Sequence, residues 1–104
     1  MNDVQQKIAD LVASNRVVLF MKGNKIFPQC GFSGMACQIL DHVGVEYMTN
    51  NVLDDNQIRE GVKVFSKWPT IPQLYINGEF IGGADIMREM FESGELKQLL
   101  EQVG

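Results

Sequence analysis

Cysteine and histidine are scarce in this chain, which has two cysteines and one histidine among its 104 residues. Small domains that depend on disulfides carry many more cysteines, so a disulfide scaffold is excluded. A structural zinc site takes four cysteine or histidine ligands at recognised spacings, and Cys30, Cys37 and His42 cannot provide them. Any metal held by this chain therefore needs further ligands from a second chain or from a small molecule.

Long apolar segments and an excess of positive charge are also missing. No apolar run approaches the roughly 20 residues that cross a bilayer. Residues 1–15 have neither the apolar centre of a secretory signal nor an Arg- and Ser-rich leader. The formal net charge of −4 argues against nucleic acid or an anionic membrane as the main partner. We therefore expect a cytoplasmic protein, with the reservation that a processed organellar protein would look the same.

The hydrophobic pattern predicts one domain over residues 1–104, built from short helices and strands. Helices are predicted at 3–13, 31–44, 54–66, 85–91 and 95–103, and strands at 17–21, 45–50, 73–76 and 79–82. Gly44 is the expected end of the second helix, Asp54 or Asp55 the expected cap of the third, and Asn77-Gly78 the expected hairpin turn. The second helix carries its apolar residues on one side: Phe32, Ala36, Ile39, Leu40 and Val43.

The order of these elements indicates the fold class. The opening β-α-β unit implies two parallel strands joined by a right-handed crossover. The closing hairpin adds two antiparallel strands. The sequence therefore predicts an α/β fold, with a central four-stranded mixed sheet flanked by helices on both faces.

Cys30 is the main candidate for a reactive group. It stands at the start of the second predicted helix, where N–H groups and the helix dipole place positive charge. Lys22, at the end of the preceding strand, can fold back toward the same point. Both effects lower a thiol pKa and favour the thiolate, which attacks disulfides and binds metals. The neighbours Gln29, Gly31 and Ser33 do not make the apolar site of a structural cysteine.

Cys30 has no second cysteine with which to form a dithiol motif. The position three residues on is Ser33, which we interpret as a hydrogen-bonding residue of the first helical turn. Cys37 lies about 10 Å further along the helix, whereas a disulfide joins Cα atoms about 4.4–6.8 Å apart. Cys37 is interpreted as a small, partly buried apolar residue, which leaves Cys30 as a lone thiol.

Two further segments have features of a ligand-binding surface. Pro72 begins a predicted strand, where it donates no ladder hydrogen bond. A cis Ile71–Pro72 bond would leave the Ile71 backbone free to pair with an extended ligand, whereas a trans turn is the commoner outcome. Gly82-Gly83 allows close approach and leads into a helix whose free N–H groups suit a carboxylate. Asp85 is either the cap of that helix or an acceptor for a ligand amine.

Together these segments resemble the monothiol glutaredoxins over nearly the whole chain. The matching motifs, in order, are Met21-Lys22-Gly23, Pro28-Gln29-Cys30-Gly31-Phe32-Ser33, Trp68-Pro69-Thr70-Ile71-Pro72-Gln73-Leu74 and Asn77-Gly78-Glu79-Phe80-Ile81-Gly82-Gly83-x-Asp85. The long loop between Lys22 and Cys30 is typical of the Cys-Gly-Phe-Ser class. The chain departs from the family at Asn24-Lys25, where Ser or Thr followed by Pro is common, and at Ala84, where Cys or Ser is common.

The resemblance implies a thioredoxin fold with a cis Pro72 and a glutathione groove beside Cys30. Glutathione carries two carboxylates and one ammonium group. In that picture Lys22 and Arg59 face the glycyl carboxylate.

The rest of the implied groove comes from the later part of the chain. The Ile71 backbone pairs with the cysteinyl unit of glutathione. The Ala84 and Asp85 backbone and the Asp85 carboxylate hold the γ-glutamyl end. Trp68 shapes the groove wall.

The resemblance also implies a homodimer bridged by a [2Fe–2S] cluster, with two Cys30 thiolates and two glutathione thiolates as its four sulfur ligands. Proteins of this class pass clusters to apo iron–sulfur proteins and pair with BolA-type proteins. Two other functions stay open. One is a glutathione-dependent oxidoreductase that removes glutathione from proteins through Cys30 alone, and the other is a regulatory module that acts through a BolA-type partner. The long loop before Cys30 favours the cluster carrier, by analogy with the family.

Overall fold

The computed structural model describes residues 2–102, which contain a four-stranded sheet with the strand order β2-β1-β3-β4. The strands are β1 (Val17–Met21), β2 (Met48–Asn51), β3 (Gln73–Ile76) and β4 (Glu79–Gly82). β1 is parallel to β2 and antiparallel to β3, and β4 is antiparallel to β3. The predicted mixed sheet is confirmed, with β1 and β3 at its centre.

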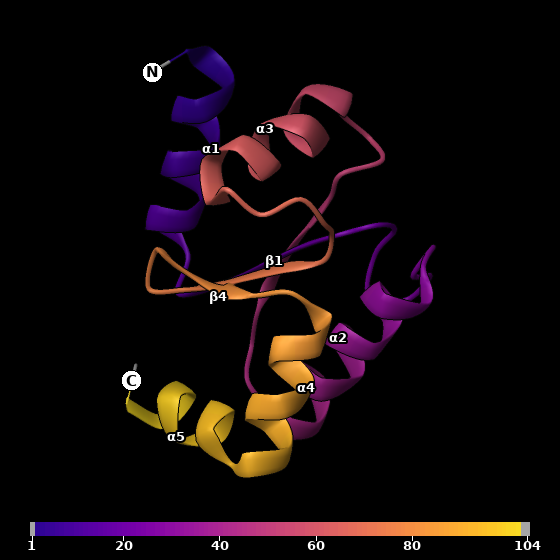
Figure 1. Ribbon diagram of the computed structural model, residues 1–104, viewed down its shortest axis with the longest axis vertical. Helices are drawn as coiled ribbons and strands as arrows, with labels where there is room; N and C mark the ends of the chain where they lie inside the picture. The colour runs from indigo at the N-terminus through magenta and orange to yellow at the C-terminus, as the bar shows by residue number, and fades with distance from the viewer. Residues whose placement is uncertain (1, 103–104) are drawn as a thin grey trace.

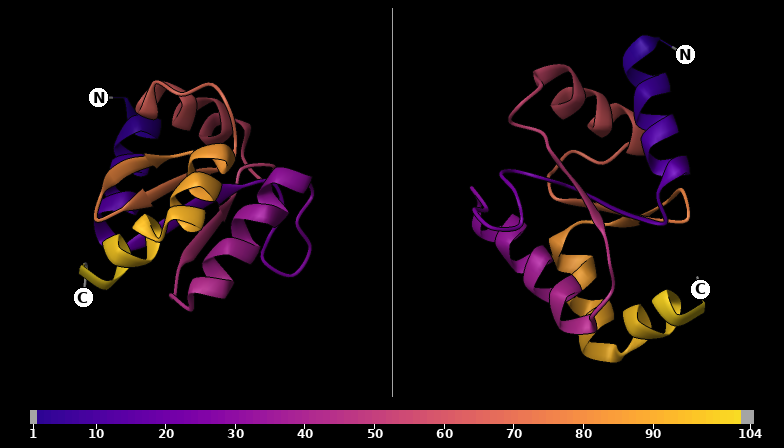
Figure 2. Two further views of the ribbon diagram at one scale, coloured as in Figure 1. Left: turned by 60° about the horizontal axis from the view of Figure 1, so that its bottom comes forward. Right: turned by 180° about the vertical axis from the view of Figure 1, so that it is seen from behind.

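Within the described range, helices cover both faces of this sheet (Figure 1). They are α1 (Asp3–Ser14), α2 (Gly31–Val43), α3 (Asn56–Ser66), α4 (Ala84–Ser93) and α5 (Glu95–Gln102). α1 packs with α3 on one face, and α4 packs with both α2 and α5 on the other (Figure 2). None of these helices combines the length and the apolar character that a membrane crossing requires.

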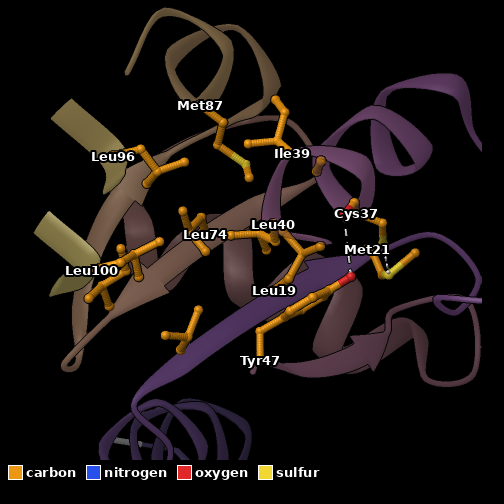
Figure 3. Packing of buried hydrophobic residues seen from close by; sticks show 13 residues of the cluster. Leu19, Met21, Cys37, Ile39, Leu40, Tyr47, Leu74, Met87, Leu96 and Leu100 are labelled. Carbon is orange, nitrogen blue, oxygen red and sulfur yellow. Dashed lines mark hydrogen bonds between the residues drawn. The ribbon is translucent and has the colours of Figure 1, made fainter. Parts of the chain in front are cut away.

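The alternation of side chains along β1 divides the core into two clusters. Val17, Leu19 and Met21 belong to the cluster beneath α2, α4 and α5. Val18 and Phe20 belong to the cluster beneath α1 and α3. A strand that is covered on both faces buries every residue, and all five side chains are at most 3% exposed. Figure 3 shows the first cluster, whose labelled residues come from both central strands, from the helices that cover them and, in the case of Tyr47, from the segment before β2.

The helix ends follow capping residues that the sequence carries. Gly44 ends α2 in the left-handed conformation, with a φ of 86°, as predicted. Of the two candidate caps of α3, the structure selects Asp55, whose side chain accepts a hydrogen bond from the Gln57 N–H at 2.9 Å. Because Asp54 precedes this cap, α3 begins two residues later than predicted.

Other predicted boundaries differ from the structure by one to three residues. β2 begins at Met48 and not at residue 45, because Met48 is its first residue that pairs with β1. α4 is one residue longer at its start and two at its end than predicted, because Gly83 and Gly94 are its caps. The predicted end of the last helix, Val103, lies outside the described residues.

The two special backbone features expected from the sequence are present. Asn77 and Gly78 have φ values of 52° and 80° and connect β3 to β4. Two successive positive φ angles are characteristic of the tight hairpin turn that Asn-Gly favours. The Ile71–Pro72 bond is cis, as the resemblance implied.

Gly61 gives the first testable prediction, because it lies where α3 packs closely on α1. A Cβ atom there would stand 2.6 Å from Val4 Cγ1 and 3.1 Å from Ile8 Cδ1. We expect Gly61→Ala to lower the free energy of unfolding by about 1–3 kcal/mol, even though alanine favours a helix. Unfolding in urea measures the change.

Gly31→Ala is the matched control, because no atom lies within 4 Å of a Cβ placed at that helical glycine. Its stability should be unchanged or slightly raised. A Gly61→Ala protein as stable as the unaltered chain would contradict the close packing of α1 against α3.

Candidate functional site

The segment between β1 and α2 forms a closed loop that leads to Cys30. The Gln29 N–H donates to the Lys22 carbonyl at 2.8 Å, and Gly23 and Pro28 form an antiparallel bridge. Gly23 has a φ of 90°, and a Cβ there would lie 2.6 Å from the Gln29 nitrogen. The loop can therefore close in this way only with glycine at position 23.

The two loop residues that depart from the family pattern hold the loop in shape. The Asn24 side-chain oxygen accepts hydrogen bonds from the N–H groups of Ile26 and Phe27 at 2.9 and 2.8 Å, which makes an Asx turn. Lys25 Nζ donates to the Tyr47 carbonyl at 2.7 Å and lies 3.9 Å from the centroid of the Tyr47 ring. Side-chain contacts thus stiffen the loop where proline is common in the family.

Cys30 occupies the N-cap position of α2 and is partly exposed. The Cys30 side chain makes no cap hydrogen bond in this structure, but the nearby Ser33 backbone N–H is the main cause that lowers the pKa of its thiol. Partial burial opposes this shift, whereas the Phe32 N–H, the charge of Lys22 and the Ser33 hydroxyl add to it. The thiolate is therefore favoured by the helix N–H groups and the lysine that the sequence indicated.

Ser33 has a second contact that the sequence did not indicate. Its side chain is fully buried, and its Oγ accepts a hydrogen bond from the Lys22 N–H at 3.0 Å. This bond joins the end of β1 to the first turn of α2. It fixes the backbone of Lys22 beside the helix start that carries Cys30.

Cys37 is a core residue. It is 3% exposed, and its Sγ lies 3.5 Å from Met21 Sδ (Figure 3). Burial is the main cause that raises the pKa of the Cys37 thiol. Neither Cys30 nor Cys37 forms a disulfide, and Cys37 is more deeply buried than the partial burial that we predicted.

A groove of about 220 Å³ lies between the first turn of α2, the segment before β3 and the start of α4. It is lined by Phe32, Trp68, Thr70, Ile71, Pro72, Gly83, Ala84, Asp85 and Ile86. Three predicted ligand-binding residues, Ile71, Ala84 and Asp85, are thus brought together, and Trp68 is part of the wall. Cys30 does not line this groove and lies instead at a separate hollow of about 550 Å³. Phe32, two residues further along the start of α2, is the groove residue nearest to Cys30 in the sequence.

The prediction that Phe32 belongs to the apolar side of α2 is wrong. Its side chain is 59% exposed and lines the groove, whereas Ala36 and Ile39 further along the helix are buried. Phe32 lies in the first helical turn, beside the groove instead of over the sheet. The sequence signal for this role is an aromatic residue in the same turn as a reactive thiol.

The start of α4 presents backbone donors to the groove. The first N–H groups of a helix have no partner within the helix, and the N-cap Gly83 has no side chain to satisfy them. A Cβ on Gly83 would lie 3.2 Å from Trp68 Nε1 and 3.3 Å from the Pro72 carbonyl, so glycine permits this close approach. Asp85 is therefore not the cap, and its exposed carboxylate lines the groove beside these N–H groups.

The two predicted cationic residues lie outside the lining of the groove. Lys22 lies beside Cys30, whose pKa its charge lowers. Arg59 lies on α3, and among residues 2–102 its buried Nε has no hydrogen-bond partner. Because this Nε is closed to solvent, an anion could reach only the other nitrogens of the guanidinium group.

A larger hollow of about 610 Å³ lies between α1, β2 and α3, and it contains neither cysteine. Within the part of the chain that the structure describes, no three His, Cys, Asp or Glu side chains are grouped to hold a metal ion. Cys30 has a lowered pKa, so its thiolate is the reactive group for which the structure gives positive evidence. Such a thiolate can attack a disulfide, or it can bind a metal together with ligands from outside the chain.

Comparison with known proteins gives consistent results. The sequence model described as Glutaredoxin matches residues 17–81. The chain is 52% identical over 99 residues to "Uncharacterized monothiol glutaredoxin ycf64-like" of Synechocystis, which covers 95% of this chain and 92% of that protein. It is 50% identical over 103 residues to "Monothiol glutaredoxin-5, mitochondrial" of Saccharomyces cerevisiae, which covers 96% and 69%.

The fold is similar to that of a buckwheat glutaredoxin solved as a complex with glutathione. The TM-score is 0.86 at 28% sequence identity, and the match covers 97% of this chain and 90% of the other. The thioredoxin fold that the resemblance implied is confirmed.

Alkylation by iodoacetamide tests the two thiol environments. At about pH 7 we expect Cys30 to react and Cys37 to stay unmodified in the folded protein, because the pKa of Cys30 is lowered and that of Cys37 is raised. The rate at Cys30 should rise with pH as the thiolate forms, with a midpoint below 9.0. Mass spectrometry of timed samples gives the rates.

Lys22→Met should move this midpoint to higher pH, because it removes a positive charge that favours the thiolate. Lys7→Met, on the exposed side of α1, is the matched control and should leave it in place. Equal rates at the two cysteines would contradict the assignment of Cys30 as the reactive thiol.

Proposed function

We propose that this chain, which belongs to the glutaredoxin family, binds glutathione beside Cys30 and holds a [2Fe–2S] cluster for storage and transfer. Relatives that are named monothiol glutaredoxins are 52% and 50% identical to it. The observation that carries this proposal is the ligand count. Cys30 is a partly exposed thiol of lowered pKa, and the only other cysteine is buried in the core. A cluster that needs four sulfur ligands must then take three from outside the chain.

The groove fits the γ-glutamyl end of glutathione. The free N–H groups at the start of α4 suit its α-carboxylate, and the Asp85 carboxylate suits its ammonium group. Ala84 contributes through its backbone. Glutathione bound in this way would run along the Ile71 backbone, whose amide groups pair with the cysteinyl unit, toward Cys30.

Lys22 and Arg59 provide positive charge for the glycyl carboxylate. Lys22 stands beside Cys30, and the buried Arg59 Nε lacks a partner among the described residues. The glycyl carboxylate would accept a charge-assisted hydrogen bond from the other nitrogens of the Arg59 guanidinium group. This assignment gives the glycyl carboxylate and the ammonium group partners of opposite charge, and gives the α-carboxylate the N–H groups of α4.

A second copy of this chain completes the ligand set most simply. Two Cys30 thiolates and the thiolates of two bound glutathione molecules give four sulfur ligands, so we propose a homodimer bridged by the cluster. The cluster is cargo in this proposal and passes to apo iron–sulfur proteins. A BolA-type protein is the candidate partner that replaces one copy.

An oxidoreductase function is the second candidate, and the lowered pKa of Cys30 favours it. The Cys30 thiolate would attack the glutathione sulfur of a protein–glutathione disulfide, and the protein thiolate would leave. A second glutathione thiolate would then release Cys30 and form oxidised glutathione. This route needs one cysteine, so it is open to this chain.

We propose a reducing compartment for either function, because Cys30 must stay reduced. The cytoplasm meets this condition, and so does the interior of an organelle. A relative with 50% identity is named as mitochondrial, which supports the organellar alternative.

The visible absorption spectrum of the anaerobically reconstituted protein tests the cluster proposal. We expect [2Fe–2S] bands that depend on added glutathione and that disappear in Cys30→Ser. Cys37→Ser is the matched control and should keep the bands, because its thiol is buried away from the groove. Loss of the bands in Cys37→Ser would contradict the ligand assignment, and a colourless protein with and without glutathione would favour the oxidoreductase.

Titration calorimetry with glutathione tests the groove. Asp85→Asn should weaken binding about tenfold, because it removes the charge that faces the ammonium group of the ligand. Glu89→Gln makes the same change at an exposed position of the same helix and should have no effect. Equal weakening by both variants would indicate a general effect of net charge, and would exclude Asp85 as a contact.

A further inference from the structure

Gln73 is a fully buried polar side chain beside the groove. It begins β3, directly after Pro72, and its exposed fraction is 0%. Gln73 does not line the groove itself. Burial of an amide is unfavourable unless its donors and acceptor are all paired, so its hydrogen bonds indicate what it does.

Both the NH₂ group and the oxygen of the Gln73 amide make hydrogen bonds. Its Nε2 donates to the Trp68 carbonyl and to the Thr70 carbonyl, each at 3.1 Å. Its Oε1 accepts from the Tyr75 hydroxyl at 3.0 Å. The orientation of the amide follows from its partners, because two carbonyl oxygens can only accept and must face the NH₂ group.

The two carbonyls belong to the irregular segment that forms one wall of the groove. This segment lies between α3 and β3 and contributes Trp68 and Thr70 to the lining. Gln73 therefore supplies bonds that regular secondary structure does not provide there.

The opposite side of the groove is close to this wall. A Cβ on Gly83 would lie 3.2 Å from Trp68 Nε1 and 3.9 Å from Thr70 Oγ1. A shift of the wall by a fraction of an ångström would therefore change the gap to the start of α4. That gap is where we place the γ-glutamyl end of glutathione.

Tyr75 holds the other end of the amide in a rigid setting. Its ring is 1% exposed and packs against Phe20, Phe65 and Phe80, with centroids 5.5 to 6.0 Å apart. The Tyr75 hydroxyl touches Gln73 but neither wall carbonyl. Removal of this hydroxyl would lose its hydrogen bond to Gln73 and its contact with Ser66, and would leave both Gln73 bonds to the wall in place.

We propose that Gln73 is a positioning residue for the groove, which sets the place of the Trp68–Thr70 wall and thereby the affinity for glutathione. The part about affinity rests on the proposed function. Gln73 acts through two backbone carbonyls and does not touch the ligand. A side chain of the same size without N–H donors would leave the wall free to move.

Gln73→Glu and Gln73→Met test this, because both keep the length of the side chain and remove the NH₂ group that donates to both wall carbonyls. We expect each to weaken glutathione binding about tenfold in calorimetry, and to shift the Trp68 indole N–H resonance in the ligand-free protein. Tyr75→Phe is the matched control. It should lower the urea midpoint but change affinity less than about twofold and leave that resonance in place.

A folded Gln73 variant that binds glutathione as tightly as the unaltered protein, or whose Trp68 resonance does not move, would overturn the proposal. So would a Tyr75→Phe protein that loses affinity to the same extent, because loss of stability alone would then explain the effect. If the unaltered protein does not bind glutathione, the proposed function fails, and the Trp68 resonance alone decides whether Gln73 fixes the wall.

A measurement on the unaltered protein covers the case in which neither Gln73 variant folds. The side-chain NH₂ resonances of Gln73 should shift when glutathione is added, because their acceptors are the carbonyls of the groove wall. Resonances that stay in place while glutathione saturates the protein would overturn the proposal.

Discussion

The antiparallel register of β1 and β3 is the constraint on which the candidate site depends. Phe20 lies opposite Gln73, so the end of β1 meets the beginning of β3. The loop that leads to Cys30 and the Ile71–Pro72 segment therefore lie at the same edge of the sheet, the one that the ends of the central strands form. β4 returns along β3 with Gly82 opposite Leu74, which brings the start of α4 to this edge as well. Three segments far apart in sequence meet there because the strand register requires it.

Two buried polar side chains, Ser33 and Gln73, hold these segments at the edge. Ser33 accepts from the backbone at the end of β1, and Gln73 donates to the backbone of the groove wall. Buried polar groups reduce stability unless their hydrogen bonds are made, and once made these bonds favour one arrangement over its alternatives. In this protein the hydrogen bond of Ser33 fixes the backbone beside Cys30, and the hydrogen bonds of Gln73 fix the wall of the groove. The core away from this edge is almost entirely apolar.

Much of the fold could be predicted from local patterns. The strands at 17–21, 73–76 and 79–82 agree with the structure, because a doubly buried strand and an Asn-Gly hairpin have distinctive local sequences. The start of β2 and the place of Phe32 could not be predicted in this way. β2 begins where its pairing with β1 begins, at Met48, and Phe32 faces a groove that other segments create. Both depend on neighbours that are distant in the chain.

Local features of the sequence are enough to identify Cys30 as a lone thiol at a helix start, because the cysteine count and the end of the preceding strand do not depend on distant residues. The family motifs also indicate which residues would contact a ligand. That Ile71, Ala84 and Asp85 line one groove, and that Arg59 has a buried nitrogen without a partner among residues 2–102, follows only from the folded arrangement. These are distances between segments, and strand register and helix packing set them.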